Sequence, residues 1–164
     1  MNALIIYDSV FGNTEKIALA IGNALGSKEE VNVLKVSDTR PDQLAGVKFL
    51  FVGSPTQRFR PMEAISGLLD RLPGNALKGV KVAAFDTRLT MDEINKTSVL
   101  AFFVRLFGTN AYAAGRIANL LRKKGGEMAG TPEGFFVVGM EGPLVEGELE
   151  RAANWAREIM AKSQ

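Results

Sequence analysis

The residues of this sequence best suited to bind a ligand are small and polar, and they fall in three short stretches that each follow an apolar run. The first stretch is "DSVFGNT", residues 8 to 14, the second is "GSPTQRFRP", residues 53 to 61, and the third is "FDTRL", residues 85 to 89. A helical pattern follows the first stretch, and a helix N-terminus attracts anions because its first backbone N–H groups are unpaired. That stretch could therefore hold a phosphate, or its residues could simply cap the helix and turn the chain.

The composition limits the chemistry that side chains alone can perform. The chain has no Cys and no His, which removes thiolate nucleophiles, imidazole catalysis and the usual ligands of zinc and haem. We therefore expect no catalytic side chain and no metal site, and any redox chemistry must come from a bound group. The first stretch also lacks the Gly-Lys-Ser/Thr of a Walker loop and the three glycines of a dinucleotide-binding fingerprint.

Apolar runs alternate with helical patterns along the whole chain. The runs span residues 3 to 7, 31 to 36, 47 to 53, 80 to 86 and 134 to 139. Between most of them, apolar residues recur at helical spacing, whereas "SDTRPDQLAG" (37 to 46) allows no more than one poor helical turn. Five strands separated by helices predict an α/β fold, a doubly wound five-stranded parallel sheet with helices on both faces.

Length, composition and charge predict one soluble domain over residues 1 to 164. The chain is 46% hydrophobic and 23% charged, and its net charge of +2 gives no reason to expect nucleic acid as a partner. No apolar run approaches the roughly 20 residues that span a bilayer. No signal-peptide pattern opens the sequence, so we expect a cytoplasmic protein.

Ligands of such a sheet bind beyond the carboxyl ends of its strands. The three polar stretches would meet at that edge, because each follows a strand. Ser9, Asn13 and Thr14 offer donors for a phosphate, and Phe59 offers a ring to a planar group. The sequence therefore predicts a site for a ligand with a phosphate end and a planar end.

At these positions the sequence resembles the flavodoxin family. The phosphate loop of that family reads Thr/Ser-x-Thr-Gly-x-Thr after the first strand; Ser9, Gly12 and Thr14 match it, while Phe11 replaces the middle threonine. With Phe11, the loop reads Ser-x-Phe-Gly-Asn-Thr. In this form it resembles the Ser-x-Phe/Tyr-Gly-Asn-Thr loop of flavodoxin-like domains in multidomain flavoproteins and quinone reductases. The resemblance continues through "GSPT" and the ending "FFVVGMEGPLVEGELERAANWA", and no insertion interrupts the fifth run, as in short-chain flavodoxins.

The resemblance implies noncovalently bound FMN, with its phosphate on residues 9 to 14 and its ring between loops 54 to 60 and 86 to 89. The cofactor-binding residues it implies are Ser9, Val10, Phe11, Gly12, Asn13, Thr14, Ser54, Pro55, Thr56, Gln57, Arg58, Phe59, Asp86, Thr87 and Arg88.

The two ring loops depart from the flavodoxin pattern in their aromatic residues. Flavodoxins usually stack the flavin between a tryptophan and a tyrosine, but here Phe59 is the one aromatic ring at positions 54 to 60 and 86 to 89. Phe59 could also be a core anchor. Each missing stacking partner is worth about 1 kcal/mol, so we expect FMN to be held more weakly than in a typical flavodoxin.

The ring loops also carry positive charge, whereas flavodoxins are typically acidic. Arg58, Arg60 and Arg88 lie there, and we expect them to stabilise a reduced, anionic flavin and so raise its potential. Two alternatives are contact with a nucleotide phosphate or an acidic partner and simple exposure to solvent, where charges have little effect.

The segment from 90 to 115 is longer than the corresponding connection in flavodoxins. Its core, "VLAFFVRLF", is strongly apolar but too short to span a membrane. The simplest expectation is an extra helix beside the flavin site. Burial in a second subunit, giving a homodimer through residues 98 to 108, is one alternative, and a lid or a membrane-surface contact is another.

Three functions follow from these features. The first is an FMN-binding electron-transfer flavoprotein of flavodoxin type, which exchanges electrons with a redox partner protein or a small electron acceptor. The second is an FMN-dependent NAD(P)H:acceptor (quinone) oxidoreductase, whose pocket the segment 90 to 115 would shape. The third is an FMN-free flavodoxin-like interaction module.

Overall fold

The computed structural model describes residues 2 to 27 and 29 to 163, and its centre is a parallel β-sheet. The strands are β1 (Ala3–Tyr7), β2 (Val31–Lys35), β3 (Phe49–Pro55), β4 (Lys81–Leu89), β5 (Glu127–Met128) and β6 (Glu133–Val137). Their order is β2-β1-β3-β4, with β5 and then β6 paired to successive parts of β4, and every one of these pairs is parallel.

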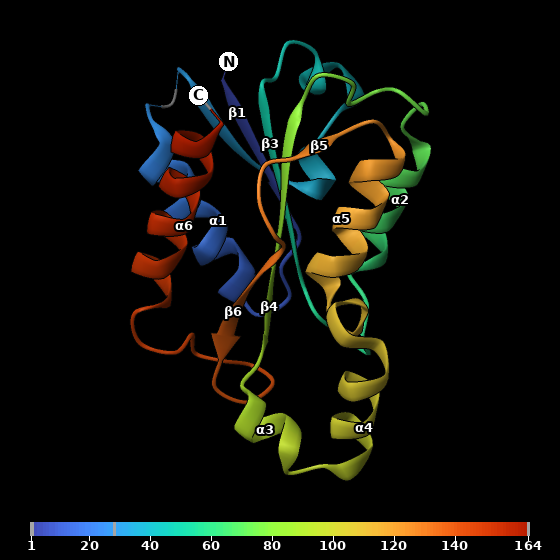
Figure 1. The fold of residues 1–164 in the computed structure, drawn as a ribbon. Coiled ribbons are helices and arrows are strands. Elements are labelled where there is room, and N and C mark those ends of the chain that lie inside the picture. Colours follow the sequence, from blue (N-terminus) through green and yellow to red (C-terminus); the bar gives the residue numbers. More distant parts are fainter. Residues whose placement is uncertain (1, 28, 164) are drawn as a thin grey trace.

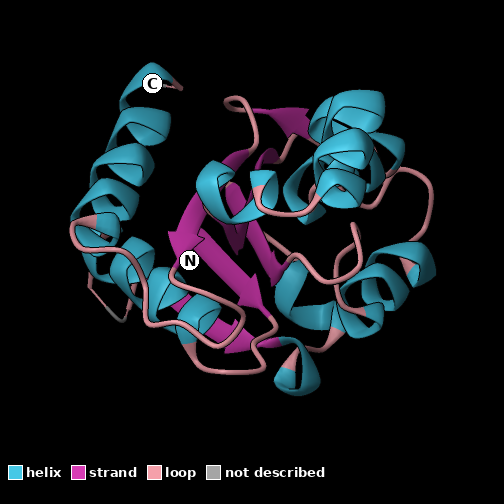
Figure 2. Ribbon diagram, turned by 90° about the horizontal axis from the view of Figure 1, so that it is seen from below, coloured by secondary structure: helices cyan, strands magenta, loops and turns pink. Residues whose placement is uncertain are grey.

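Helices cover both faces of this sheet, which confirms the doubly wound fold (Figure 1). Helices α1 and α6 lie on one side and α2 and α5 on the other, and Figure 2 shows the sheet between them from below. The helices are α1 (Asn13–Leu25), α2 (Glu63–Arg71), α3 (Met91–Asn95), α4 (Ser98–Phe107), α5 (Ala113–Lys123) and α6 (Glu148–Lys162). Short 3₁₀ turns occur at η1 (Val36–Asp38), η2 (Pro41–Leu44) and η3 (Gly108–Ala111).

Side chains alternate between two cores because successive strand residues point to opposite faces. Leu4 and Ile6 belong to the core under α2 and α5, and Ile5 belongs to the core under α1 and α6. Trp155 of α6 is partly buried against this second core and packs edge-on on Phe85, with ring centroids 6.3 Å apart.

The strand boundaries differ from the sequence prediction at the carboxyl edge. The fifth run was predicted at 134 to 139, but that edge of the sheet is built in two pieces, β5 and β6, and β6 ends at Val137. Strand β4 was predicted to end at Asp86 and continues to Leu89. The continuation is possible because β6 pairs with Phe85 to Leu89 and so satisfies the backbone of this polar stretch. The segment 37 to 46 was also underestimated, since its region holds two 3₁₀ turns, η1 and η2.

The segment from 90 to 115 forms the extra helix that was expected, together with a short second one. Thr90 begins α3 by accepting a hydrogen bond from the Glu93 amide, and α4 follows. Both helices lie beyond the carboxyl ends of the strands (Figure 1). No residue of α4 is fully buried.

Strand β6 is an edge strand whose backbone groups are satisfied by side chains and by the loop after it. The buried Glu148 carboxylate accepts from the Phe136 amide and from Arg151, and Arg151 also donates to the Gly134 carbonyl. The Phe136 carbonyl accepts from Val145. These contacts block the pairing of another strand at this edge.

Replacing Glu148 with glutamine is expected to flatten the acid dependence of stability. Burial alone would raise the pKa of Glu148, but hydrogen bonds from Arg151 and the Phe136 amide outweigh it and lower that pKa below 4.5. The carboxylate therefore stabilises the fold above pH 4.5, and this contribution disappears as the pH falls through the folded-state pKa. We expect Glu148→Gln to lose about 1–2 kcal/mol at pH 7, allowing for the partial exposure of Arg151.

Urea unfolding from pH 3 to 7 measures this effect, with Glu150→Gln, an exposed glutamate of the same helical turn, as the matched control. Equal acid slopes for Glu148→Gln and wild type would contradict the assigned role.

Candidate functional site

The loop after β1 has the geometry of an anion site. Gly12 lies in the left-handed region at φ 86° and directly precedes α1, a conformation that costs glycine little. Its amide donates to the Ser9 hydroxyl at 3.1 Å. The turn places residues 9 to 14 around the positive end of the α1 dipole.

Several predicted donors of this loop are used within the protein. The Asn13 side-chain amide donates to the Glu141 carbonyl at 2.9 Å, and the Thr14 and Thr87 hydroxyls form a buried hydrogen bond of 2.8 Å. Asn13 and Thr14 are themselves buried, whereas Val10 and Phe11 are exposed. The side chains of Asn13 and Thr14 therefore fix the loop.

The backbone amides of the same loop are free to bind a phosphate. Within the described residues, no protein group accepts from the amides of Val10, Phe11, Asn13 or Thr14. Unpaired amides at a helix N-terminus are the donor set that a phosphate requires. The residues present fit the phosphate of FMN.

The loop after β3 is fixed by its hydroxyls. The fully buried Ser54 donates to the Pro55 carbonyl and accepts from the Met62 amide at 2.8 Å. Thr56 accepts from the Ala113 amide at 2.8 Å and so holds the start of α5. Both hydroxyls set the shape of the loop.

The tip of this loop is a tight two-residue turn. Gln57 and Arg60 exchange two backbone hydrogen bonds of 3.0 Å, and Arg58 and Phe59 between them both have positive φ, at 50° and 63°. Non-glycine residues in this region cost about 1 kcal/mol or more each. The Phe59 ring packs on Phe103 of α4 at 5.0 Å, which ties the turn to α4.

The end of β4 holds a buried ion pair. Asp86 is fully buried and accepts from Arg88 Nε at 2.6 Å and Nη2 at 2.8 Å, and also from the Ala114 amide at 2.9 Å. Burial raises the pKa of Asp86, and Arg88 opposes that rise. The Arg88 guanidinium lies 3.7 Å from the centre of the Tyr112 ring. Its charge is therefore compensated, unlike the charges of exposed Arg58 and Arg60.

The three predicted stretches thus lie at the carboxyl edge of the sheet and contact one another. Thr14 joins the first to the third, and the Thr56 amide bonds the Thr87 carbonyl at 2.9 Å. Two neighbours of the site were missed. Tyr112 lies 24 residues from Arg88 in sequence and carried no local signal. The loop 139 to 142 could have been found from its glycines, Gly139 and Gly142, both at positive φ.

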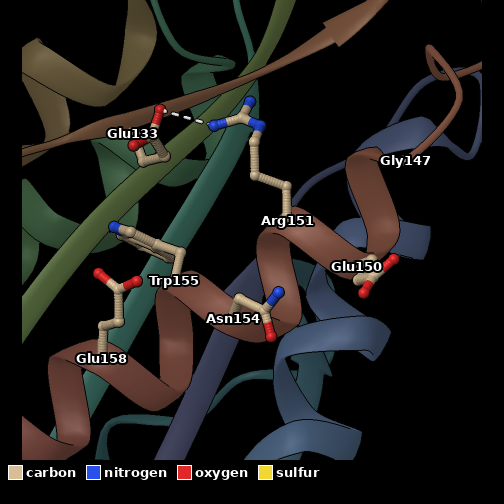
Figure 3. Close-up of a pocket in the computed structure, with 7 residues that line it drawn as sticks. All are labelled: Glu133, Gly147, Glu150, Arg151, Asn154, Trp155 and Glu158. Atoms are coloured by element: carbon tan, nitrogen blue, oxygen red, sulfur yellow. Dashed lines mark hydrogen bonds and ion pairs between the residues drawn. The ribbon is translucent and has the colours of Figure 1, made fainter.

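A hollow of about 440 Å³ lies away from these three loops, along the first turns of α6 (Figure 3). Its lining is Glu133, Gly147, Glu150, Arg151, Asn154, Trp155 and Glu158, so it contains none of the predicted site residues. Arg151 points toward Glu133 across it, with an ion pair of 3.1 Å. Three of its seven lining residues are glutamates, and its arginine is already paired with Glu133 and Glu148, so this lining disfavours a phosphate.

Among the described residues there is no group of three or more side chains that could hold a metal ion. Likewise, none of the helices in the described part of the chain is both long and apolar enough to cross a membrane.

Comparison with known proteins agrees with this geometry. The family model described as flavodoxin matches residues 5 to 155. No curated protein matches the chain in sequence.

Solved structures share the fold at low identity. Flavodoxin 2 from Bacillus cereus is 23% identical, with 99% of each chain covered and a TM-score of 0.75. A flavodoxin from the domain Archaea is 22% identical over 100% of both chains, with a TM-score of 0.72. The rubredoxin oxygen:oxidoreductase of Desulfovibrio gigas is 19% identical, with a TM-score of 0.68, over 99% of this chain and 37% of that one.

The match to a carrier family favours neither the quinone oxidoreductase nor the FMN-free module as the function. The family model spans nearly the whole chain and includes each of the three loops at the carboxyl edge. The chain therefore belongs to the flavodoxin family and is an electron-transfer flavoprotein of flavodoxin type.

Proposed function

We propose that this chain binds FMN at the carboxyl edge of its sheet, with the phosphate on residues 9 to 14 and the ring beside the loops 54 to 60 and 86 to 89. The observation that carries the proposal is the row of unpaired amides at the start of α1, next to both ring loops. When bound, FMN would supply one- and two-electron chemistry that no side chain of this protein offers.

The residues of the site then divide into two roles. The amides of Val10, Phe11, Asn13 and Thr14 and the Ser9 hydroxyl would bind the phosphate. The remaining implied residues hold or border the loops around the ring: Ser54, Pro55, Thr56, Gln57, Arg58, Phe59, Asp86, Thr87 and Arg88. Phe59 already packs on Phe103, so one face of its ring is shared with α4.

The test is the absorbance spectrum after incubation with excess FMN and desalting. Retained flavin bands, together with weaker binding of riboflavin, are expected because the phosphate site contributes much of the affinity. Failure to retain or bind any flavin would overturn the proposal.

Anaerobic mixing with reduced pyridine nucleotide should leave the flavin oxidised for seconds or longer, since the protein is proposed as a carrier and not as an oxidoreductase.

Replacing Arg58 with glutamine is expected to lower the potential of bound flavin by about 10–40 mV per electron. Arg58 is exposed and its charge has no partner among the described residues, so its effect on a reduced anion corresponds to a surface interaction of about 0.2–1 kcal/mol. A redox titration measures the shift. Arg122→Gln, at the far end of α5, is the control, and an equal shift in both variants would contradict a local effect.

We further propose that the electron partner is a protein or a small acceptor at this same edge, and that the outer face of α4 joins two copies of the chain. Val99, Phe102 and Leu106 recur at helical spacing on this face and are 60%, 60% and 61% exposed. Exposed apolar stripes of this kind usually mark an interface. A cytoplasmic location remains a prediction.

Replacing Leu106 with aspartate is expected to convert a dimer to a monomer, because a charge would be buried in the apolar contact. Light scattering at several concentrations measures the mass in solution. Leu19→Asp, at an exposed leucine of α1, is the matched control and should leave the mass unchanged. A monomeric wild type at all concentrations would rule out the interface.

A further inference from the structure

The α3–α4 segment encloses a small cavity against the ends of β3 and β4. The cavity has a volume of about 110 Å³, and its lining comes from the turn after β3, the end of β4 and the segment from α3 to α5. It is distinct from the hollow on α6 in Figure 3, with which it shares no lining residue.

Most of the cavity wall is apolar, from the side chains of Phe59, Leu89, Ile94, Leu100, Val104 and Ala111. Its volume is somewhat below the roughly 150 Å³ of an engineered cavity that binds benzene, and well below the 300 Å³ or more of pockets for drug-sized ligands. A space of this size suits one six-membered ring.

The charged groups of the lining are two arginines, which can only donate. Arg88 uses Nε and Nη2 for Asp86, and among the described residues no group accepts from its Nη1. Arg58 also lines the cavity, is exposed, and has no ion-pair partner in the described part of the chain. No carboxylate is present in the lining. Because the Arg88 charge is balanced by Asp86, Arg58 supplies the net positive charge.

Guanidinium donors that line an apolar space suit one ligand chemistry. Arginine binds carboxylates through paired N–H groups, and such charge-assisted hydrogen bonds are about twice as strong as neutral ones. A flat ring would contact the apolar wall, and a carboxylate on that ring would reach the donors.

We propose that this cavity binds a small aromatic carboxylate, with its ring among the apolar side chains and its carboxylate at Arg58 and Arg88. Half of its lining residues lie between Ile94 and Tyr112, and the other half belong to the loops proposed to hold the flavin ring. It adds a small-molecule site to an electron carrier, between α4 and the loops proposed to hold the flavin ring.

The test is a titration with benzoate followed by the backbone amide signals of Phe59, Leu89 and Val104 in FMN-loaded protein. Saturable shifts at these residues are expected. Benzoate should bind at least about tenfold more tightly than acetate, which has the charge without the ring, and than benzyl alcohol, which has the ring without the charge.

Two variants probe the two halves of the site. Val104→Phe fills the cavity and should weaken benzoate binding at least tenfold, whereas Val99→Phe, the same change on the outer face of the same helix, should alter it less than twofold. Arg58→Gln should weaken binding several-fold, and Arg105→Gln, at an exposed arginine of α4, should not. Arg58 is a surface residue, so its variant tests the site even if Val104→Phe fails to fold.

Several results would overturn this proposal. These are the absence of saturable binding, equal affinity for benzoate and acetate, or no effect of both Val104→Phe and Arg58→Gln. Competition between FMN and benzoate would assign the cavity to the flavin ring and would overturn it as well. The same titration with flavin-free protein keeps the two proposals separate, because benzoate should bind there even if FMN does not.

Discussion

Replacing Asp86 with alanine is expected to lower the free energy of unfolding by about 3–5 kcal/mol, the typical cost of breaking a buried ion pair. Asp86 is fully buried, and the Arg88 side chain that it binds is only 17% exposed. Without the carboxylate, a guanidinium charge would stay buried with no counter-charge. The Ala114 amide at the start of α5 would also lose its acceptor.

Urea unfolding of three variants separates the lost pair from general disruption. Asp42→Ala removes an exposed aspartate paired with Arg40 and should cost less than about 1 kcal/mol. The double variant Asp86→Ala/Arg88→Met removes both buried charges and should recover part of the loss. A double variant no more stable than Asp86→Ala would show that the unpaired charge is not the cause.

This pair also explains why the role of Arg88 could not be predicted from the sequence. A run of Asp86, Thr87 and Arg88 after an apolar strand is typical of a solvent-exposed loop. In the structure β6 pairs with this run, and Arg88 packs so closely over Gly134 that a Cβ there would overlap the guanidinium. Such long-range contacts leave no local pattern, so the charge compensation by Asp86 was not foreseen.

The strands, by contrast, could be predicted because burial on both faces leaves continuous apolar runs. The loop after β1 could be predicted as well, since Gly12 and its polar neighbours directly follow a strand and precede an amphipathic helix. The sequence could not predict which groups of this loop face a ligand. The partners of Asn13 and Thr14 are Glu141 and Thr87, which are far away in the sequence.

Replacing Ser9 with aspartate is expected to weaken FMN binding at least about 100-fold. The structure leaves the backbone amides of residues 10 to 14 as the main phosphate donors, with no basic side chain hydrogen-bonded to the loop among the described residues. A carboxylate about 4 Å from the phosphate, which carries nearly two negative charges, adds several kcal/mol of repulsion at an effective dielectric constant near 20. Screening by salt reduces this, and 100-fold corresponds to about 2.7 kcal/mol.

The control is Ser9→Asn, which has nearly the same shape as the aspartate variant but no charge, and we expect it to weaken FMN binding less than tenfold. Riboflavin, which lacks the phosphate, should bind Ser9→Asp and Ser9→Asn about equally. Flavin fluorescence titrations measure all four affinities. If Ser9→Asp and Ser9→Asn bind FMN equally, the phosphate does not lie on this loop, because a charge placed among its amides could not be without effect. If instead the loss is confined to FMN and to the charged variant, the anion site is the row of backbone amides at the start of α1.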